Sequence, residues 1–293
     1  MVMESDAVEL FRAPPHDHLE VAGGAVAHRV VGSGPPVLYV HGWPASGATF
    51  RRLLPHLADR FTCHLIDLPG AGDSRWTADP SPSIGGHIAA LREVVDLLGL
   101  DGFGVVGHDS GGLIARHALG GDPRVRAMAL IDTEHPNDPS LLFRAFAASR
   151  HTPGGAAVLR FVTEHPRVAR NRFVFGGAFV DRSLLGGDFD EFFLRPLRED
   201  AARRDAAVSI LRSFGLGYVR SLAGIHPRIE VPVRLVWGER DPFFPVRRAR
   251  EMVGQFPDAS LTVVAGAALF SHEERPLEVA TAVAEGLAVL DAG

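Results

Sequence analysis

The stretch Gly107-His108-Asp109-Ser110-Gly111-Gly112 decides the fold class more than any other part of the sequence. It follows the apolar run Phe103–Val106, which predicts a strand, and it opens the pattern Gly111–Leu119, which predicts a helix. A strand that turns sharply into a helix through small residues is typical of a nucleophile elbow, in which a strained turn raises one side chain above the sheet. The sequence therefore predicts a sheet with a reactive side chain at its edge.

Two registers of this turn compete for the exposed side chain. The pattern small-x-nucleophile-x-small-small fits the glycines of the stretch and places Asp109 at the exposed position. The alternative Gly-x-Ser-x-Gly pattern would place Ser110 there, but it needs a small residue where His108 stands. We expect Asp109 to be the nucleophile.

Alternating strand and helix patterns extend from the elbow in both directions. Apolar runs predict strands at 19–22, 25–31, 37–40, 61–68, 103–106, 125–131, 233–237 and 261–264, and helical spacing predicts helices at 50–58, 84–98, 111–119, 246–256 and 276–290. Between 135 and 228 the alternation stops, and helical stretches such as 156–164 and 199–214 replace it. This order predicts an α/β fold: a core domain, 1–134 and 229–293, with a mainly parallel sheet flanked by helices, and an inserted helical cap domain, 135–228.

Composition limits the class of protein. The chain has 293 residues, 46% of them hydrophobic, and a formal net charge of −5, which suits one or two soluble globular domains and does not favour a nucleic-acid partner. All 30 basic residues are arginines, which excludes Schiff-base or P-loop lysine chemistry, and the single Cys63 excludes an internal disulfide. We see no membrane span and no apolar leader near the N-terminus, so we expect a cytoplasmic protein without a membrane partner.

Phenylalanine is concentrated in the predicted cap. Ten of the 18 phenylalanines lie between residues 135 and 228. They could form the small core of the cap itself, or they could line an apolar pocket beneath it. The second interpretation predicts a small apolar molecule as the partner. The sequence does not indicate whether the chain forms an oligomer.

Four segments in this order resemble the α/β-hydrolase fold superfamily, in particular its branch of epoxide hydrolases and haloalkane or haloacetate dehalogenases. They are His41-Gly42-Trp43-Pro44, the elbow at Asp109, Trp237-Gly238-Glu239-Arg240-Asp241 and Ser271-His272-Glu273-Glu274. The resemblance implies an α/β-hydrolase fold and an aspartate nucleophile that forms an alkyl-enzyme ester. It spans nearly the whole chain.

Catalytic order in this superfamily is nucleophile, acid, histidine. The resemblance therefore implies a triad of Asp109, Asp241 and His272, in which the acid orients the imidazole. Asp132, at the end of the predicted strand 125–131, is the alternative acid. Backbone N–H groups of Trp43 and Ser110 are expected to form the oxyanion hole.

The remaining site residues are assigned to substrate. We assign His41, Trp43, His108 and His151 to the substrate-binding surface. The branch's epoxide hydrolases protonate the opened ring with cap tyrosines, and Tyr218 is the only tyrosine of the predicted cap. Dehalogenases bind halide with tryptophan N–H groups, but Ser110 follows the nucleophile here and the cap has no tryptophan.

We therefore expect hydrolysis of an apolar epoxide to a vicinal diol, with water activated by His272 and with no metal or organic cofactor. The first alternative is a haloalkane or haloacetate dehalogenase. The second, from another class, is a non-hydrolytic binding protein or pathway enzyme on the same fold.

Overall fold

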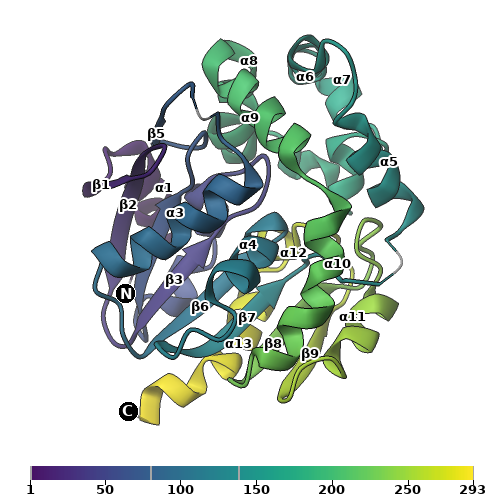
Figure 1. Ribbon diagram of the computed structural model, residues 1–293. Helices are drawn as coiled ribbons and strands as arrows, with labels where there is room; N and C mark the ends of the chain where they lie inside the picture. Colours follow the sequence, from purple (N-terminus) through teal and green to yellow (C-terminus); the bar gives the residue numbers. More distant parts are fainter. Residues whose placement is uncertain (1, 80, 138, 293) are drawn as a thin grey trace.

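A single twisted sheet organises the computed structural model, which describes residues 2–79, 81–137 and 139–292 (Figure 1). Across these residues the sheet has nine strands in the order β1-β2-β4-β3-β6-β7-β8-β9, and β5 pairs with β2. Neighbours from β4 to β9 are parallel, whereas β2 pairs antiparallel with β1, β4 and β5. The strands are β1 Asp17–Val21, β2 Gly24–Gly32, β3 Pro36–Val40, β4 Thr62–Asp67, β5 Arg75–Trp76, β6 Phe103–His108, β7 Val125–Ile131, β8 Val233–Gly238 and β9 Ala259–Val264.

Helices cover both faces of this sheet. The core helices are α1 Glu4–Arg12, α2 Leu54–Leu57, α3 Ile84–Leu97, α4 Ser110–Leu119, α10 Leu216–Ile225, α11 Val246–Val253, α12 Ser271–Glu274 and α13 Pro276–Gly286. On β6, a Cβ added to Gly107 would meet Gly112 in α4, whereas one added to Gly104 would meet Leu287 and Leu290 just beyond α13. Because strand side chains alternate between faces, positions three residues apart point to opposite sides. Helices α4 and α13 therefore cover opposite faces.

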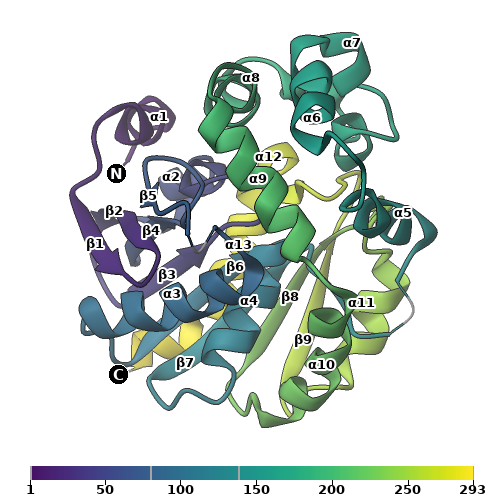
Figure 2. The same cartoon turned by 45° about the horizontal axis from the view of Figure 1, so that its top comes forward.

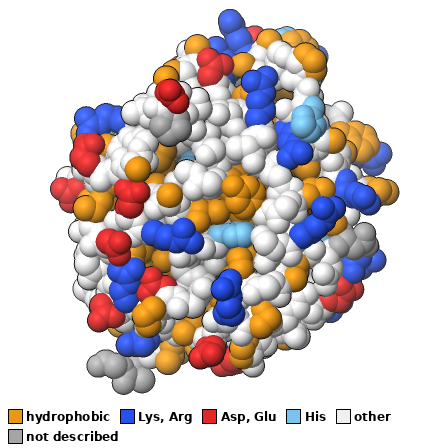
Figure 3. Space-filling model, viewed as in Figure 1, with side chains coloured by type: hydrophobic (Ala, Val, Ile, Leu, Met, Phe, Trp, Pro, Cys, Tyr) orange, Lys and Arg blue, Asp and Glu red, His pale blue; other side chains and the backbone are white. Residues whose placement is uncertain are grey.

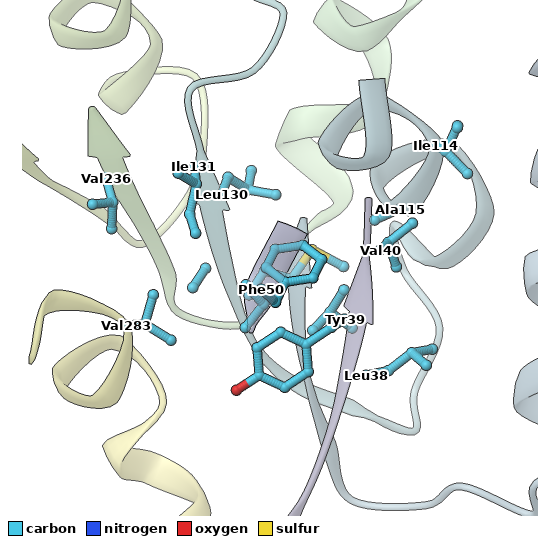
Figure 4. Close-up of a cluster of buried hydrophobic side chains, with 14 of the residues drawn as sticks. Leu38, Tyr39, Val40, Phe50, Ile114, Ala115, Leu130, Ile131, Val236 and Val283 are labelled. Atoms are coloured by element: carbon cyan, nitrogen blue, oxygen red, sulfur yellow. The ribbon is translucent and has the colours of Figure 1, made fainter. Parts of the chain in front are cut away.

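The core lies between the sheet and these helices (Figure 4). In β3, Leu38, Tyr39 and Val40 are fully buried, as two-sided cover of a parallel strand requires. The Tyr39 ring packs against the edge of Phe50 in the 3-10 helix η1, Gly47–Phe50. Tyr39 is thus a core residue and contributes no hydroxyl to the edge of the sheet where the elbow lies.

A helical cap connects β7 to β8 and lies over the carboxyl ends of the strands (Figures 1 and 2). It includes α5 Leu141–Ser149, α6 Gly155–Glu164, α7 Pro166–Ala169, α8 Arg195–Glu199 and α9 Ala201–Ser213. The last helix before β8, α10, packs instead on α4 of the core. The space-filling view shows hydrophobic side chains gathered in a recess at the centre of the face covered by α3, α4 and α10 (Figure 3).

The predicted fold class is confirmed: a mainly parallel sheet flanked by helices carries an insertion of helices. The predicted helix 50–58 is in fact two short pieces, η1 and α2, because Pro55 fits only the first turn of a new helix. Helix α1 and strand β5 were not predicted. No helix in the described ranges has the length and apolar character needed to cross a bilayer.

Candidate active site

The elbow register places Asp109 at the strained position. Its backbone has φ 50° and ψ −133°, a region that residues other than glycine rarely adopt, whereas Ser110 already begins α4. The turn is held by close packing, since a Cβ on Gly111 would come within 2.1 Å of the Val40 carbonyl oxygen. These contacts favour the register with Asp109 at the elbow over the one with Ser110.

Hydrogen-bond donors lie close to the Asp109 carboxyl group. Its Oδ2 accepts a hydrogen bond of 3.1 Å from the Trp43 backbone N–H, and the Ser110 hydroxyl lies 3.4 Å away. Burial and the neighbouring Glu134 raise the pKa of Asp109 well above its ordinary value, and the backbone N–H groups of Ser110 and Trp43 oppose that rise. The two N–H groups expected to form an oxyanion hole therefore both point at the Asp109 carboxyl.

A cavity of about 420 Å³ lies between Asp109 and the cap. Its walls include seven phenylalanines, which are Phe143, Phe146, Phe173 and Phe175 from the cap and Phe243, Phe244 and Phe270 from core loops. Other cap phenylalanines pack on one another, as Phe189 does with Phe179 and Phe193. Both interpretations of the phenylalanine-rich cap thus describe part of it, and Asp109 faces an apolar chamber.

His272 does not meet Asp109, which is a correction to the expected triad. Its Nε2 lies 2.8 Å from the Thr49 hydroxyl, and its Nδ1 has no hydrogen-bond partner among the described residues. Burial, His108, Arg51 and Arg52 lower the pKa of His272 well below its ordinary value, whereas a triad imidazole has a carboxylate beside it. The physical reason is the short helix α12, which turns His272 away from the cavity and against Thr49.

The two candidate acids also lack a histidine. Asp241 accepts hydrogen bonds from the Phe243 and Phe244 backbone N–H groups through Oδ1, while its buried Oδ2 has no partner in the described part of the chain. Burial raises the pKa of Asp241 to about 7. Asp132 accepts from the Gly238 backbone N–H and the Ser271 hydroxyl, and so it ties β7 to β8 and α12.

Leu269 occupies the cavity wall that the histidine was expected to reach. It lines the same cavity as Asp109, and its carbonyl oxygen lies 3.0 Å from Nε2 of His108. Ala267, two residues before Leu269, contacts the segment that leads to Asp241, since the Arg240 N–H donates to the Ala267 carbonyl oxygen at 2.8 Å. An aliphatic side chain therefore replaces a base beside the elbow.

The expected ring-opening donor, Tyr218, and His151, which was assigned to the substrate-binding surface, lie elsewhere. Tyr218 lies on α10, and its hydroxyl oxygen lies 3.1 Å from where a Cβ on Gly85 of α3 would stand. His151 is an exposed residue whose Nε2 accepts from Arg150. Neither Tyr218 nor His151 lines the cavity beneath the cap. The assignment of Tyr218 as ring-opening donor is therefore a second correction, because α10 packs on the core.

The other assigned residues are placed as follows. Trp43 lines the cavity, but its indole N–H donates to the Ala207 carbonyl oxygen of α9. His41 accepts from the Leu68 backbone N–H and borders a separate small cavity. His108 stacks edge-on with His272, with ring centroids 4.3 Å apart. Trp43 alone of the four residues assigned to substrate borders the chamber at Asp109.

Sequence reasoning missed Glu134. It lies three residues beyond the end of strand β7, at the edge where the elbow lies, is 1% exposed, and borders a second cavity together with Asp109. A carboxylate just after a central strand was the available signal, but it was applied only to Asp132. No group of three histidine, cysteine or acidic residues that could hold a metal ion occurs within the ranges the structure describes.

The fold and the site together define a capped α/β protein of the hydrolase class with a carboxylate at its elbow. Residues 35–276 match the family model described as alpha/beta hydrolase fold, and the chain belongs to this family. It is a hydrolase of the α/β fold by family.

The chain is also similar to two curated relatives and to one solved structure. The chain is 34% identical over 180 residues to a pimeloyl-[acyl-carrier protein] methyl ester esterase of Stenotrophomonas maltophilia, a match that covers 54% of this chain and 66% of that relative. The enzyme of the same name from Chromobacterium violaceum is 30% identical over 83% of this chain and 92% of its own length. An alpha/beta hydrolase fold protein from Burkholderia ambifaria aligns with a TM-score of 0.76 at 24% identity, covering 95% of this chain and 98% of that one.

Proposed function

We propose that this chain opens an epoxide on an apolar small molecule through a covalent ester to Asp109 and then releases a vicinal diol. The observation that carries the proposal is the Asp109 carboxyl, whose Oδ2 is held by the Trp43 backbone N–H at the wall of the apolar cavity. A carboxylate fixed in this way can attack an sp³ carbon. The same N–H group then stabilises the oxyanion that forms when water attacks the ester.

The bond changes define what else the site must supply. A carboxyl oxygen of Asp109 bonds to one ring carbon, the ring C–O bond breaks, and the alkoxide takes up a proton. Water then attacks Cγ of Asp109 and loses a proton to a base, and the intermediate expels the diol and restores the carboxyl group. Neither His272 nor Tyr218 lines the cavity to serve these proton transfers.

The tryptophan contacts favour an epoxide over an organohalide. A departing halide needs N–H donors in an apolar site. The Trp43 indole N–H donates to the Ala207 carbonyl oxygen at 2.9 Å, and the Trp237 indole N–H donates to the Phe244 carbonyl oxygen at 2.6 Å. Both indoles are therefore engaged by backbone and do not offer a halide site.

The contacts at the elbow also argue against assigning to this chain the methyl ester cleavage that the relatives' names indicate. Such acyl transfer uses a serine activated by a histidine. Here the Ser110 hydroxyl accepts from the Trp43 backbone N–H at 3.0 Å and lies beside Asp109, and no histidine within the described ranges hydrogen-bonds to it. An aspartate nucleophile that forms an alkyl ester fits these contacts better.

The test is to trap the ester. The enzyme is mixed with styrene oxide or 1,2-epoxydodecane, quenched in acid, and the peptide that carries Asp109 is analysed by mass spectrometry while diol is measured in parallel. We expect an adduct on Asp109 in the wild type and none in Asp109→Asn, whereas Ser110→Ala keeps it. Diol without any adduct, or cleavage of methyl esters that is lost in Ser110→Ala, would contradict the proposal.

A further inference from the structure

We infer that Glu134 is a further catalytic residue, the acid–base partner of Asp109. The inference rests on the function proposed above and deepens it, because it names the group that exchanges protons with the alkoxide and with the attacking water. Four observations carry it: a shared cavity, the lack of a competing base, a shared hydroxyl, and the balance of charge around the pair.

The first observation is a small cavity of about 20 Å³ that Asp109, Ser110 and Glu134 line together. Its other walls are largely apolar side chains, among them Trp43 and Phe143. A cavity of roughly 10–15 Å³ accommodates one water molecule if polar partners surround it. The space therefore suits a single water in a cavity that Asp109 and Glu134 both line.

The second observation is the lack of another side chain that could act as the base. Among the described residues, no histidine or tyrosine lines either this cavity or the large chamber under the cap. Arg150 is the only other charged side chain among the described residues that line the large chamber, and a guanidinium cannot act as a base at neutral pH. Glu134 is thus the side chain that shares a cavity with Asp109 and can both accept and donate a proton.

The third observation is the hydroxyl of Thr133, which can serve Glu134 in either protonation state. Its Oγ1 accepts from Arg116 at 2.8 Å, and it lies 2.7 Å from the Asp109 carbonyl oxygen and 2.9 Å from Oε2 of Glu134. A hydroxyl has one hydrogen to donate. It can donate it to an ionised Glu134, or it can donate to the Asp109 carbonyl while a protonated Glu134 donates to it.

The fourth observation is the charge environment. Burial raises the pKa of Glu134, and the nearby Arg116 opposes that rise. Glu134 in turn contributes to the raised pKa of Asp109. Two carboxyl groups that interact in this way in a site of low polarity hold one proton between them, so one can act as an acid while the other is ionised.

The proton balance closes with that single proton. In the first step ionised Asp109 attacks the ring carbon, the ring C–O bond breaks, and the proton of Glu134 passes through the intervening water to the alkoxide. In the second step ionised Glu134 takes a proton from that water as its oxygen bonds to Cγ of Asp109. The ester C–O bond then breaks, and the leaving alkoxide takes the proton of the new Asp109 carboxyl group. The diol leaves with Asp109 ionised and Glu134 protonated, which is the arrangement of the shared proton from which the next attack starts.

The experiment compares adduct formation with adduct release in the full-length enzyme. Styrene oxide is mixed with the wild type, with Glu134→Gln, and with Glu164→Gln, a control at the exposed end of α6 whose partner is Arg160. We expect Glu134→Gln to form the Asp109 ester more slowly, because it cannot protonate the alkoxide, and to release diol from that ester at least about 10²-fold more slowly than the wild type, the size of a lost general base. Glu164→Gln should match the wild type, and Glu134→Asp should restore part of the rate.

Each outcome decides something. An ester that persists in Glu134→Gln and turns over in Glu134→Asp supports the inference. Diol release by Glu134→Gln within threefold of the wild type overturns it while the proposed function stands. An ester that persists in the wild type itself also overturns it, because no base would then be acting. Absence of both ester and diol in every variant overturns the proposed function and the inference together. Thermal unfolding of Glu134→Gln shows whether it is folded, and if it is not, the Glu134→Asp rate decides.

Discussion

Two segments that leave the carboxyl ends of strands in the same sheet behave differently: the turn from β6 into α4 and the loop from β9 into α12. Both were expected to deliver a catalytic side chain. The first holds Asp109 at a positive φ against the cavity. The second places Leu269 at the cavity and carries His272 to Thr49 instead.

The difference teaches which sequence signals fix a side chain in space. At the elbow, Gly107 and Gly111 are required because a Cβ at either would collide with backbone, so the pattern itself sets the register. The loop after β9 has no such steric requirement around His272. A histidine after the last strand therefore indicates only that an imidazole is nearby, and one helical turn is enough to separate it from the nucleophile.

The largest expected effect separates the two carboxyl groups predicted for the triad. Asp109→Asn should lower diol formation by at least about 10³-fold, because the nucleophile is lost. Asp241→Asn should change it less than about threefold, since an asparagine Oδ1 can still accept from Phe243 and Phe244 and no histidine depends on it. Steady-state diol assays measure both. Equal losses in the two variants would contradict the account and indicate that Asp241 acts in a catalytic triad.

The next effect tests whether a base can be returned to the loop. Leu269→His would place an imidazole at the cavity wall near the loop of Asp241, whose Oδ2 lacks a partner among the described residues. In a Glu134→Gln background we expect this change to speed release of the Asp109 ester by about 10²-fold. Rapid-quench measurement of ester decay checks it, with Leu269→Asn as the control. No acceleration would mean that this wall does not face the ester.

The pH dependence of the free energy of unfolding tests the environment of His272. Burial lowers its pKa, so the unfolded chain binds more protons than the folded one as the pH falls below about 6.5, and the free energy of unfolding decreases there. A triad histidine beside a carboxylate would behave in the opposite way. Denaturant unfolding at about pH 7 and pH 5 should show a smaller loss in His272→Gln than in the wild type, by up to about 1.4 kcal/mol per pH unit. A larger loss in the variant would contradict the account.

The smallest effect concerns Tyr218. Its hydroxyl lies against Gly85 on α3 rather than in the cavity, so Tyr218→Phe should leave diol formation within about twofold of the wild type. The rate constants for ester formation and release are the measurement. A loss above about tenfold, in a variant that unfolds at the same temperature, would return Tyr218 to the role of ring-opening donor.

Much of the fold could be predicted because its signals are repetitive. The alternation of apolar runs and helical patterns, and its interruption between 135 and 228, gave the sheet and the cap insertion. Features without periodicity were missed, such as the two-residue strand β5 and the break caused by Pro55. The position of α10 on α4 was also missed, because a helical pattern does not say against which layer a helix packs.

The site could be predicted in part for the same reason. Asp109 and Trp43 follow from motifs with strict packing, and the structure brings them together. The structure does not bring His272 to this site. The segment Ser271-His272-Glu273-Glu274, followed by Pro276, is typical of the start of a helix, and this signal could have indicated that the histidine turns away. The signal of a carboxylate after β7 was applied only to Asp132, and the cavity walls then show that Glu134 and Leu269 each line a cavity together with Asp109.

The central claim is that Asp109 forms the ester and that His272 takes no part in its hydrolysis. The direct test is one turnover of styrene oxide in water enriched in oxygen-18, followed by mass spectrometry of the peptide that carries Asp109. Attack of water on Cγ predicts one heavy oxygen in Asp109, in the wild type and equally in His272→Gln. Label found only in the diol, or lost from Asp109 in His272→Gln, would contradict the account.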